Sequence, residues 1–399
     1  MHDSTTVRSR QSTLTPQCLI SGVDAMHDPL TIRRRRGGAP WRLGAAALAM
    51  LAATSPKTVT AAPPEFMVEL RLDGRSIEGM PLSADARRVR LLARDGRLWE
   101  FPPEKARDYR QTASAFQSYS ISEFRAALLR ELGEGFEVSG AGNYLVAHPR
   151  GRRDQWAPRF EELYRSFVHY FGVRGMRIAP PRFPLIAIVC RGRDEFQRYS
   201  ARRYGDSSGV MGYYSIETNR IVLYDMGGKA DSPDWRLNAQ VVIHEATHQT
   251  AFNTGVHNRF APPPLWVAEG LATMFETPGV YDARRHPRLE DRVHAERLAA
   301  FRRLARPGHR PERLRAMIAA DEVFRTQPEA TYAEAWALSF LLVETRPRQY
   351  VEYLARTAAR EPFVAVSASD RLGDFVEMFG DDWAMLEARL LRFVDELPR

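Results

Sequence analysis

Apolar residues recur at two different periods along the chain, and the period changes near its middle. Apolar and polar positions alternate over residues 66–101, around an Asp-Gly turn, which predicts a small β-unit. Similar patterns predict strands or hairpins at 136–149, 183–190 and 209–225, the last with its turn near Asn219. The predicted strands therefore all lie in the N-terminal part of the chain.

Spacings of three and four between apolar residues predict helices, and these dominate the second half of the chain. Earlier helices are expected at 122–132, 156–171, 193–205 and 237–250. From residue 288 onward the pattern is helical: 288–304, 311–320, 332–344, 349–359, 371–379 and 383–397. Strands before a central helix and helices after it predict an α+β fold with a mainly helical C-terminal lobe.

The first 62 residues have the pattern of a targeting segment. Four arginines at 33–36 precede an eleven-residue apolar stretch at 43–53, and small residues follow it. These are the marks of a cleaved secretory signal, and the apolar stretch is too short to span a bilayer. Because residues 1–25 lack any core pattern, we expect translation to start at Met26. The mature protein is expected to be exported, periplasmic or secreted, without a stable membrane anchor.

The sequence HEATH at 244–248 predicts a metal site. On a helix, positions i and i+4 lie on the same face, so His244 and His248 can present two imidazoles to one ion, with Glu245 beside them. A catalytic zinc ion needs neutral nitrogen ligands and a carboxylate that can take a proton from water. Because the chain has only two cysteines, any metal must be held by His, Asp or Glu.

A second glutamate completes the predicted ligand set. Twenty residues separate His248 from Glu269, which lies in the sequence WVAEGLATMFE. The prolines at 262–264 can start a second helix and Gly255 can end the first. An antiparallel pair of helices would then bring Glu269 to the histidines and leave a fourth position to water. Glu276 lies two turns further along the same face, where it could hydrogen-bond a liganding imidazole.

HEATH followed by WVAEGLATMFE resembles the gluzincin metallopeptidases, also called peptidase MA-like. In that superfamily, HExxH and the glutamate of a W-x-x-E-G-x-A motif supply the metal ligands. The sequences NRIVL at 219–223 and YAEAWAL at 332–338 also resemble the bacterial family called domain of unknown function 1570. The resemblance covers residues 154–345, and its two central motifs are the specific part of it.

The resemblance implies a zincin-like catalytic domain, in which a mixed sheet packs on the HExxH helix. It also implies one zinc ion held by His244, His248 and Glu269, with Glu245 as the general base. In the aminopeptidase branch a tyrosine some sixty residues past the third ligand stabilises the oxyanion, and Tyr332 matches that position here. The Gly-Met-Glu-Asn motif of that branch is absent, so recognition of a free substrate N-terminus is not supported. The third histidine of the metzincins is absent too.

The other histidines are interpreted without a role at the metal. His257 lies in a predicted loop shortly after the HEATH sequence, and we do not expect it to be a ligand. His286, His294 and His309 lie among arginines and are expected on the solvated surface. Trp266 is expected to pack in the core and to seat the second helix.

The formal charge of +8 could indicate nucleic-acid binding, but its distribution argues against that. Residues 1–62 hold eight basic and three acidic residues, so the predicted mature chain carries only +3. No motif of interleaved aromatic and basic residues supports a nucleic-acid surface. We therefore expect no nucleic-acid partner and interpret the basic excess mainly as part of an export signal.

The sequence thus predicts four parts: a targeting segment at 1–62, an N-terminal β-rich region at 63–150, a zincin-like catalytic domain at 151–282 and a helical C-terminal lobe at 283–399. The first functional hypothesis is an exported zinc metallohydrolase, a peptidase acting on peptides or proteins. The alternative is a non-catalytic, metal-containing binding or scaffold protein of the cell envelope. Substrate identity, endo- versus exo-cleavage, oligomeric state and the role of the N-terminal region stay open.

Overall fold

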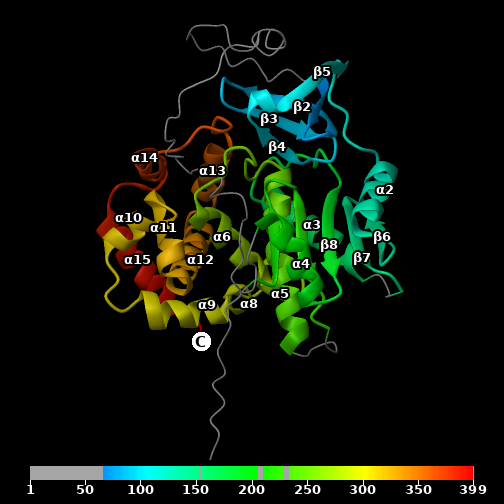
Figure 1. The fold of residues 1–399 in the computed structure, drawn as a ribbon. Coiled ribbons are helices and arrows are strands. Elements are labelled where there is room, and N and C mark those ends of the chain that lie inside the picture. Colours follow the sequence, from blue (N-terminus) through cyan, green and yellow to red (C-terminus); the bar gives the residue numbers. More distant parts are fainter. Residues whose placement is uncertain (1–65, 152–154, 205–209, 228–232, 399) are drawn as a thin grey trace, which may run out of the picture.

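The computed structural model describes residues 66–151, 155–204, 210–227 and 233–398. The expected targeting segment at 1–62 and the expected start at Met26 lie outside these residues. The described part contains two five-stranded sheets and a lobe of helices. Figure 1 shows the N-terminal sheet above the second sheet, with the helical lobe to their left. This arrangement confirms the expected α+β class.

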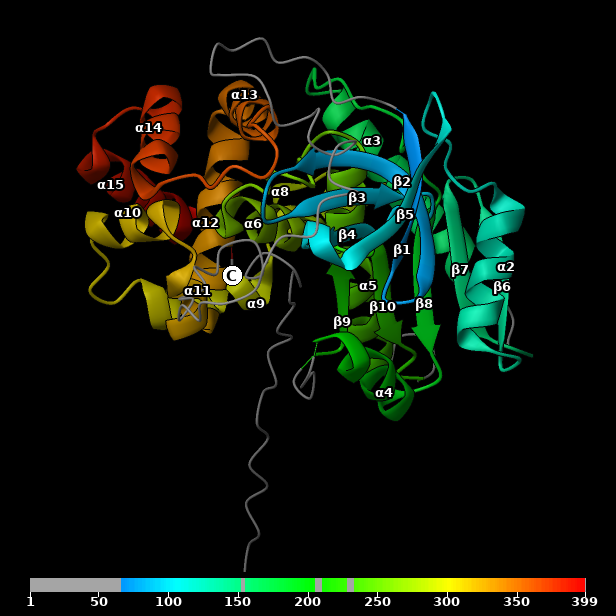
Figure 2. The same cartoon turned by 45° about the horizontal axis from the view of Figure 1, so that its top comes forward.

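The N-terminal sheet is antiparallel, with strand order β4-β3-β2-β1-β5. Its strands are β1 (Met67–Leu72), β2 (Arg75–Ala84), β3 (Val89–Ala93), β4 (Leu98–Phe101) and β5 (Ala106–Ala113), with a short 3-10 turn η2 (Pro103–Lys105) before the last. The predicted β-unit is therefore present, and it extends one strand further than the pattern indicated. The backbone N–H of Leu98 donates at 2.8 Å to the carbonyl of Glu217, which lies in a turn between two strands of the second sheet. Figure 2 shows the N-terminal sheet in front of the second sheet.

The second sheet is mixed, with strand order β6-β7-β8-β10-β9. Its elements are α2 (Ile121–Leu132), β6 (Phe136–Ala141), β7 (Tyr144–Pro149), α3 (Trp156–Gly172), β8 (Leu185–Cys190), α4 (Arg193–Tyr204), β9 (Gly212–Ser215) and β10 (Arg220–Tyr224). Strand β8 pairs in parallel with β7 and β10, whereas β6 and β9 are antiparallel edges. Because β6 and β7 belong to this sheet, the expected boundary at residue 150 falls within one structural layer.

Helix α5 (Pro233–Asn253) carries the HEATH sequence and packs on β9, β10 and α3. Val241, Val242 and Ala246 are buried against the sheet. The edge strand approaches the helix closely at Gly212, where a Cβ atom would lie 2.7 Å from Cγ1 of Val241. A glycine at this position therefore lets α5 lie directly on the sheet.

The helical lobe follows α5. It contains α6 (Leu265–Phe275), α7 (Pro278–Tyr281), α8 (Leu289–Arg292), α9 (Ala295–Ala300), the π-helical turn η3 (Phe301–Ala305), α10 (Pro311–Ala319), α11 (Glu322–Thr326), α12 (Pro328–Thr345), α13 (Pro347–Ala358), α14 (Ala368–Phe379) and α15 (Trp383–Glu396). None of the helices in the described ranges has the length and hydropathy that a membrane span requires.

One expected helix is wrong. The pattern predicted a single helix over 288–304, but the structure has α8, a break at Val293 and His294, and then α9 and η3. The backbone of His294 is extended, and its side chain accepts the N–H of Arg297 as the N-cap of α9. A side chain that caps a helix competes with the continuous helical backbone, and apolar spacing alone does not reveal this.

The core of the lobe lies where α6 packs along α12. Trp266 is fully buried, and its ring stacks on Tyr353 at 5.7 Å, which confirms its expected packing role. The two helices touch at Gly270, where a Cβ atom would lie 2.2 Å from Oγ of Ser339 and 2.6 Å from the carbonyl oxygen of Ala335. The glycine of the WVAEGLA sequence is therefore required by helix contact.

Candidate metal centre

Helix α5 presents two histidines from the same face, one turn apart. The rings of His244 and His248 are 4.7 Å apart, and their Nε2 atoms are 3.0 Å apart. At that distance the two nitrogens cannot both carry a proton, because the two N–H groups would point at each other. At least one nitrogen therefore directs a lone pair into the space between the rings, as a metal ligand does.

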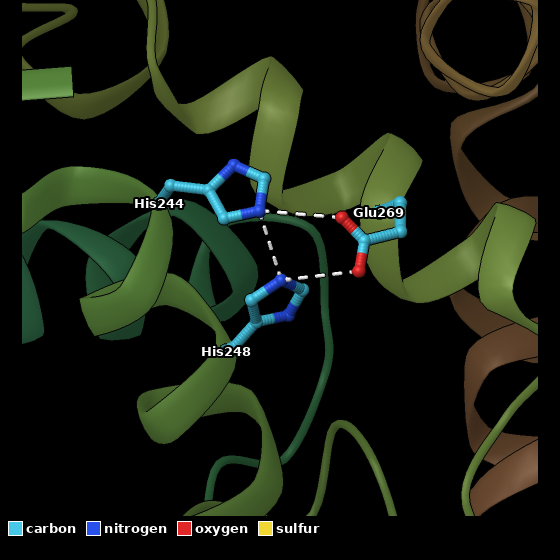
Figure 3. A group of neighbouring side chains, drawn as sticks. All are labelled: His244, His248 and Glu269. Atoms are coloured by element: carbon cyan, nitrogen blue, oxygen red, sulfur yellow. Dashed lines mark hydrogen bonds and ion pairs between the residues drawn. The ribbon is translucent and has the colours of Figure 1, made fainter. Parts of the chain in front are cut away.

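Helix α6 brings Glu269 to the same point, as the sequence predicted. Oε2 of Glu269 lies 3.3 Å from Nε2 of His244, and Oε1 lies 3.6 Å from Nε2 of His248. The three side chains converge from the two helices (Figure 3). All three are buried, and each offers one ligand atom within 4.8 Å of the other two.

These residues fit a zinc ion. Zinc bonds of about 2.0 to 2.1 Å in a tetrahedron separate neighbouring ligand atoms by about 3.3 Å. The two Nε2 atoms are 3.0 Å apart, and Oε2 of Glu269 lies 3.3 Å from Nε2 of His244, while its other oxygen, Oε1, lies 3.6 Å from Nε2 of His248. Oε2 of Glu269 is buried and has no hydrogen-bond partner among the described residues. A buried carboxylate oxygen in that state is costly unless a cation or a donor satisfies it. Two imidazoles and one carboxylate are also a typical zinc ligand set.

Glu276 lies behind His244. Its Oε1 accepts a hydrogen bond from Nδ1 of His244 at 2.7 Å, and its side chain is only 8% exposed. A proton on Nδ1 leaves the lone pair of His244 on Nε2, toward Glu269 and His248. The structure therefore places Glu276 where the sequence predicted a residue that orients a ligand.

The expected surface position of His294 is wrong. This residue is 5% exposed, and its Nε2 lies 2.8 Å from Oε2 of Glu276. Glu276 is thus bonded by two imidazoles, one on each carboxylate oxygen. Little in the sequence indicates this contact. His294 lies in the break between α8 and α9, so the spacing of apolar residues in a helix does not predict which way its side chain points.

The histidines hold the neighbouring carboxylates ionised. Burial would raise the pKa of Glu269, but His248 and His244 outweigh burial and lower that pKa to about 2. The pKa of Glu276 is also well below its usual range, because hydrogen bonds from His244 and His294 overcome the effect of burial. A bound divalent cation would act on Glu269 in the same direction. Both carboxylates are therefore ionised at neutral pH, the form in which Glu269 could bind a cation.

Glu245 and Tyr332 are the remaining residues that the sequence singled out. Glu245 is buried on α5 between the two histidine positions. Tyr332 is half-buried on α12, the helix that packs on α6, and its ring meets Phe324 edge-on at 5.3 Å. The guanidinium of Arg297 lies 5.5 Å from the centre of the Tyr332 ring. Glu245 therefore follows His244 directly on α5 and is buried, and Tyr332 lies in the helical layer around α6.

Two further histidines have structural contacts. Burial and the nearby His248 lower the pKa of His257 to about 3, and Nδ1 of His257 lies 3.0 Å from the carbonyl of Val256.

The expected surface position of His309 is wrong, because its ring is fully buried between Glu334 and Glu387, 2.9 Å from each. Burial opposes protonation of His309, but the two carboxylates outweigh it and raise its pKa.

A set of buried amide groups fixes α5 on the sheet behind the metal site. Nε2 of Gln249 donates to the carbonyls of Ile186 and Asn219, both at 3.0 Å. The amides of Asn219 and Asn253 bond each other, and Oδ1 of Asn219 also accepts from the hydroxyl of Tyr214 at 2.7 Å. Asn219 has a φ of 59° at the predicted hairpin turn. The sequence predicted the turn, but it did not predict these bonds to the helix.

Solved structures that resemble this chain include M1 zinc metallopeptidases. Two are from Deinococcus radiodurans: one aligns with 17% identity and a TM-score of 0.36, and a mutant bound to a Tyr-Ser-Ala substrate aligns with 16% identity and a TM-score of 0.37. Each alignment covers 66% of this chain and 52% or 53% of the other, so the chain spans about half the length of these structures. Similarity at this level carries no inference about activity.

A family match covers the residues that form the site. No curated protein matches the sequence. Residues 238–364 match the family described as "Protein of unknown function (DUF1570)", and this segment contains the HEATH sequence, Glu269, Glu276, His294 and Tyr332. The resemblance to the domain of unknown function 1570 family that the sequence motifs indicated is therefore confirmed over residues 238–364.

Proposed function

We propose that this protein is a zinc-dependent hydrolase with a zincin-like catalytic domain, and that its substrates are peptides or proteins. The observation that carries the proposal is the convergence of His244, His248 and Glu269 from two helices, with buried ligand atoms all within 4.8 Å of one another. The three residues would hold one zinc ion. Bound zinc supplies a Lewis acid that polarises a carbonyl and lowers the pKa of a water molecule.

The neighbouring side chains then move the protons. Glu245, buried next to His244, takes a proton from the attacking water and returns it to the leaving amine. Glu276 keeps the proton of His244 on Nδ1, so that this histidine stays a neutral ligand. The hydroxyl of Tyr332 donates to the oxyanion of the tetrahedral intermediate, a contact that strengthens as charge develops.

We propose peptides as the substrates because the chain has the gluzincin-like motifs HExxH and WxxEGxA. The presence of Glu245 favours a hydrolase over the scaffold alternative. A protein that only binds metal has no chemical need for a general base beside the ligands. The export signal predicted in residues 1–62 would place this hydrolase in the periplasm or outside the cell. Fractionation of cells that express the full sequence tests that location, and recovery of the whole chain in the cytosol would contradict it.

The test of the reaction compares three chains on a peptide library, each with and without a chelator. The unaltered chain should cleave peptides, and the chelator should stop it. Glu245→Gln should keep its zinc and lose at least about a hundredfold in turnover, the scale of a lost general base. His248→Ala should lose both zinc and cleavage. Full turnover by Glu245→Gln would contradict the mechanism, and zinc binding without any cleavage by the unaltered chain would favour the scaffold alternative.

A further inference from the structure

His294 donates a hydrogen bond to the carboxylate that orients His244. Glu276 accepts from Nδ1 of His244 at 2.7 Å on one oxygen, and Nε2 of His294 lies 2.8 Å from the other. His294 is 5% exposed, and the Glu276 side chain is 8% exposed. Both bonds are therefore shielded from water, where a hydrogen bond to a charged group is strong and a missing donor is costly.

The helix cap fixes which nitrogen of His294 carries the proton. Its Nδ1 accepts the backbone N–H of Arg297 at 3.4 Å, as the N-cap of α9. A nitrogen that accepts must be unprotonated, so the proton of the neutral ring stands on Nε2, toward Glu276. The ring of Trp336 packs edge-on against that of His294, with the ring centres 6.4 Å apart.

We propose that His294 is a positioning residue for the metal centre. By donating to Oε2 of Glu276, it leaves Oε1 in place to accept from Nδ1 of His244, and His244 then presents Nε2 to the metal. This inference rests on the proposed zinc site and extends it by one further residue, the N-cap of α9. The break between α8 and α9 belongs to the same arrangement, because it sets the ring of His294 at the start of α9.

Two substitutions separate this role from simple helix capping. Asparagine carries its amide oxygen near the position of Nδ1, so His294→Asn keeps the cap and removes the donor to Glu276. Glutamine carries its amide nitrogen near the position of Nε2, so His294→Gln keeps the donor and weakens the cap. If His294 serves only as the cap of α9, the asparagine variant should retain more zinc affinity than the glutamine variant. If His294 positions Glu276, the glutamine variant should retain more zinc affinity than the asparagine variant.

The experiment measures zinc affinity of the full chain by competition with a chromophoric chelator. Loss of a residue that supports a metal ligand costs about 10- to 100-fold in affinity. We expect His294→Asn to lose about tenfold, near the low end because it acts through Glu276. His294→Gln should stay much closer to the unaltered chain. The control is His286→Asn, a change at a half-exposed histidine, which should leave the affinity unchanged.

A double-mutant cycle with Glu276→Gln tests the path of the effect. If His294 acts through Glu276, His294→Asn should add little further loss once Glu276 is changed. Equal losses in both backgrounds, or an affinity of His294→Asn equal to that of His286→Asn, would overturn the inference while leaving the zinc site intact. Failure of the unaltered chain to bind zinc would overturn the proposed function, and this inference with it.

Discussion

Gly270 offers a sharp test of how Glu269, the proposed third ligand, is placed. It follows Glu269 in the sequence and lies where α6 touches α12. A Cβ atom there would lie 2.2 Å from Oγ of Ser339 and 2.6 Å from the backbone oxygen of Ala335. The serine side chain can rotate, but the carbonyl is part of helix α12, so Gly270→Ala must push the two helices apart.

The size of the effect follows from two opposing contributions. Overpacking a core costs about 1 to 3 kcal/mol, and a clash with backbone belongs near 3. Replacing a mid-helix glycine by alanine returns about 1 kcal/mol through helix propensity. We therefore expect Gly270→Ala to lower the free energy of unfolding by about 2 kcal/mol. Zinc affinity should fall as well, because the shift moves Glu269 away from the two histidines.

Gly373 provides a matched control. It lies within α14 and is exposed, and a Cβ atom added there would have no heavy atom within 4 Å. Gly373→Ala should raise the free energy of unfolding by about 0.5 to 1 kcal/mol through propensity alone. Thermal unfolding of both variants and a zinc titration make the comparison. A Gly270→Ala chain as stable as Gly373→Ala, with unchanged zinc affinity, would show that the contact between α6 and α12 does not set the position of Glu269.

Three further predictions address the lobe, the hairpin and the metal. The pKa of His309 is raised in the fold, so its contribution to stability is complete below its ordinary pKa of 6.5 and is lost as the pH rises through the folded-state value. The difference in stability between the unaltered chain and His309→Gln, measured by thermal unfolding, should therefore shrink as the pH rises. A difference that stays constant with pH would contradict this. Asn219→Ala should destabilise the chain by about 2 to 4 kcal/mol, because it loses buried hydrogen bonds and adds about 1 kcal/mol for alanine in the left-handed backbone conformation. Asn219→Gly loses the same hydrogen bonds without that backbone cost, so it should be less destabilised. Equal losses in the two variants would exclude a backbone contribution. Zinc at about 100 times its dissociation constant should stabilise the chelator-treated chain by about 2.7 kcal/mol, and the same zinc-dependent shift in His248→Ala would show binding elsewhere.

The sequence predicted the residues of the candidate metal site because much of their geometry is local. His244 and His248 are one helical turn apart, so a single correct helix assignment places both rings on one face. Glu269 required a second helix and a turn between them, and the prolines before α6 supplied that signal. Glu276 followed from the same helix, two turns after Glu269, and the structure places it against His244 at 2.7 Å.

The parts that the sequence missed depend on contacts between distant elements. His294 and His309 stand among arginines in the sequence. Both side chains are nevertheless buried, and both contact carboxylates from distant parts of the chain. The division at residue 150 separated β7 from β8 because an intervening helix, α3, hides their parallel pairing from any local pattern. Hydrophobic periodicity reports which face of an element is buried, but it does not report which element covers that face.

The central claim is that His244, His248 and Glu269 hold one zinc ion. Its most direct test is the zinc content of the purified chain, measured by elemental analysis beside that of His248→Ala. We expect about one zinc per unaltered chain and close to none in the variant, because a site of three protein ligands that loses one no longer holds zinc firmly. Equal zinc in the two chains, or none in the unaltered chain after exposure to zinc, would contradict it.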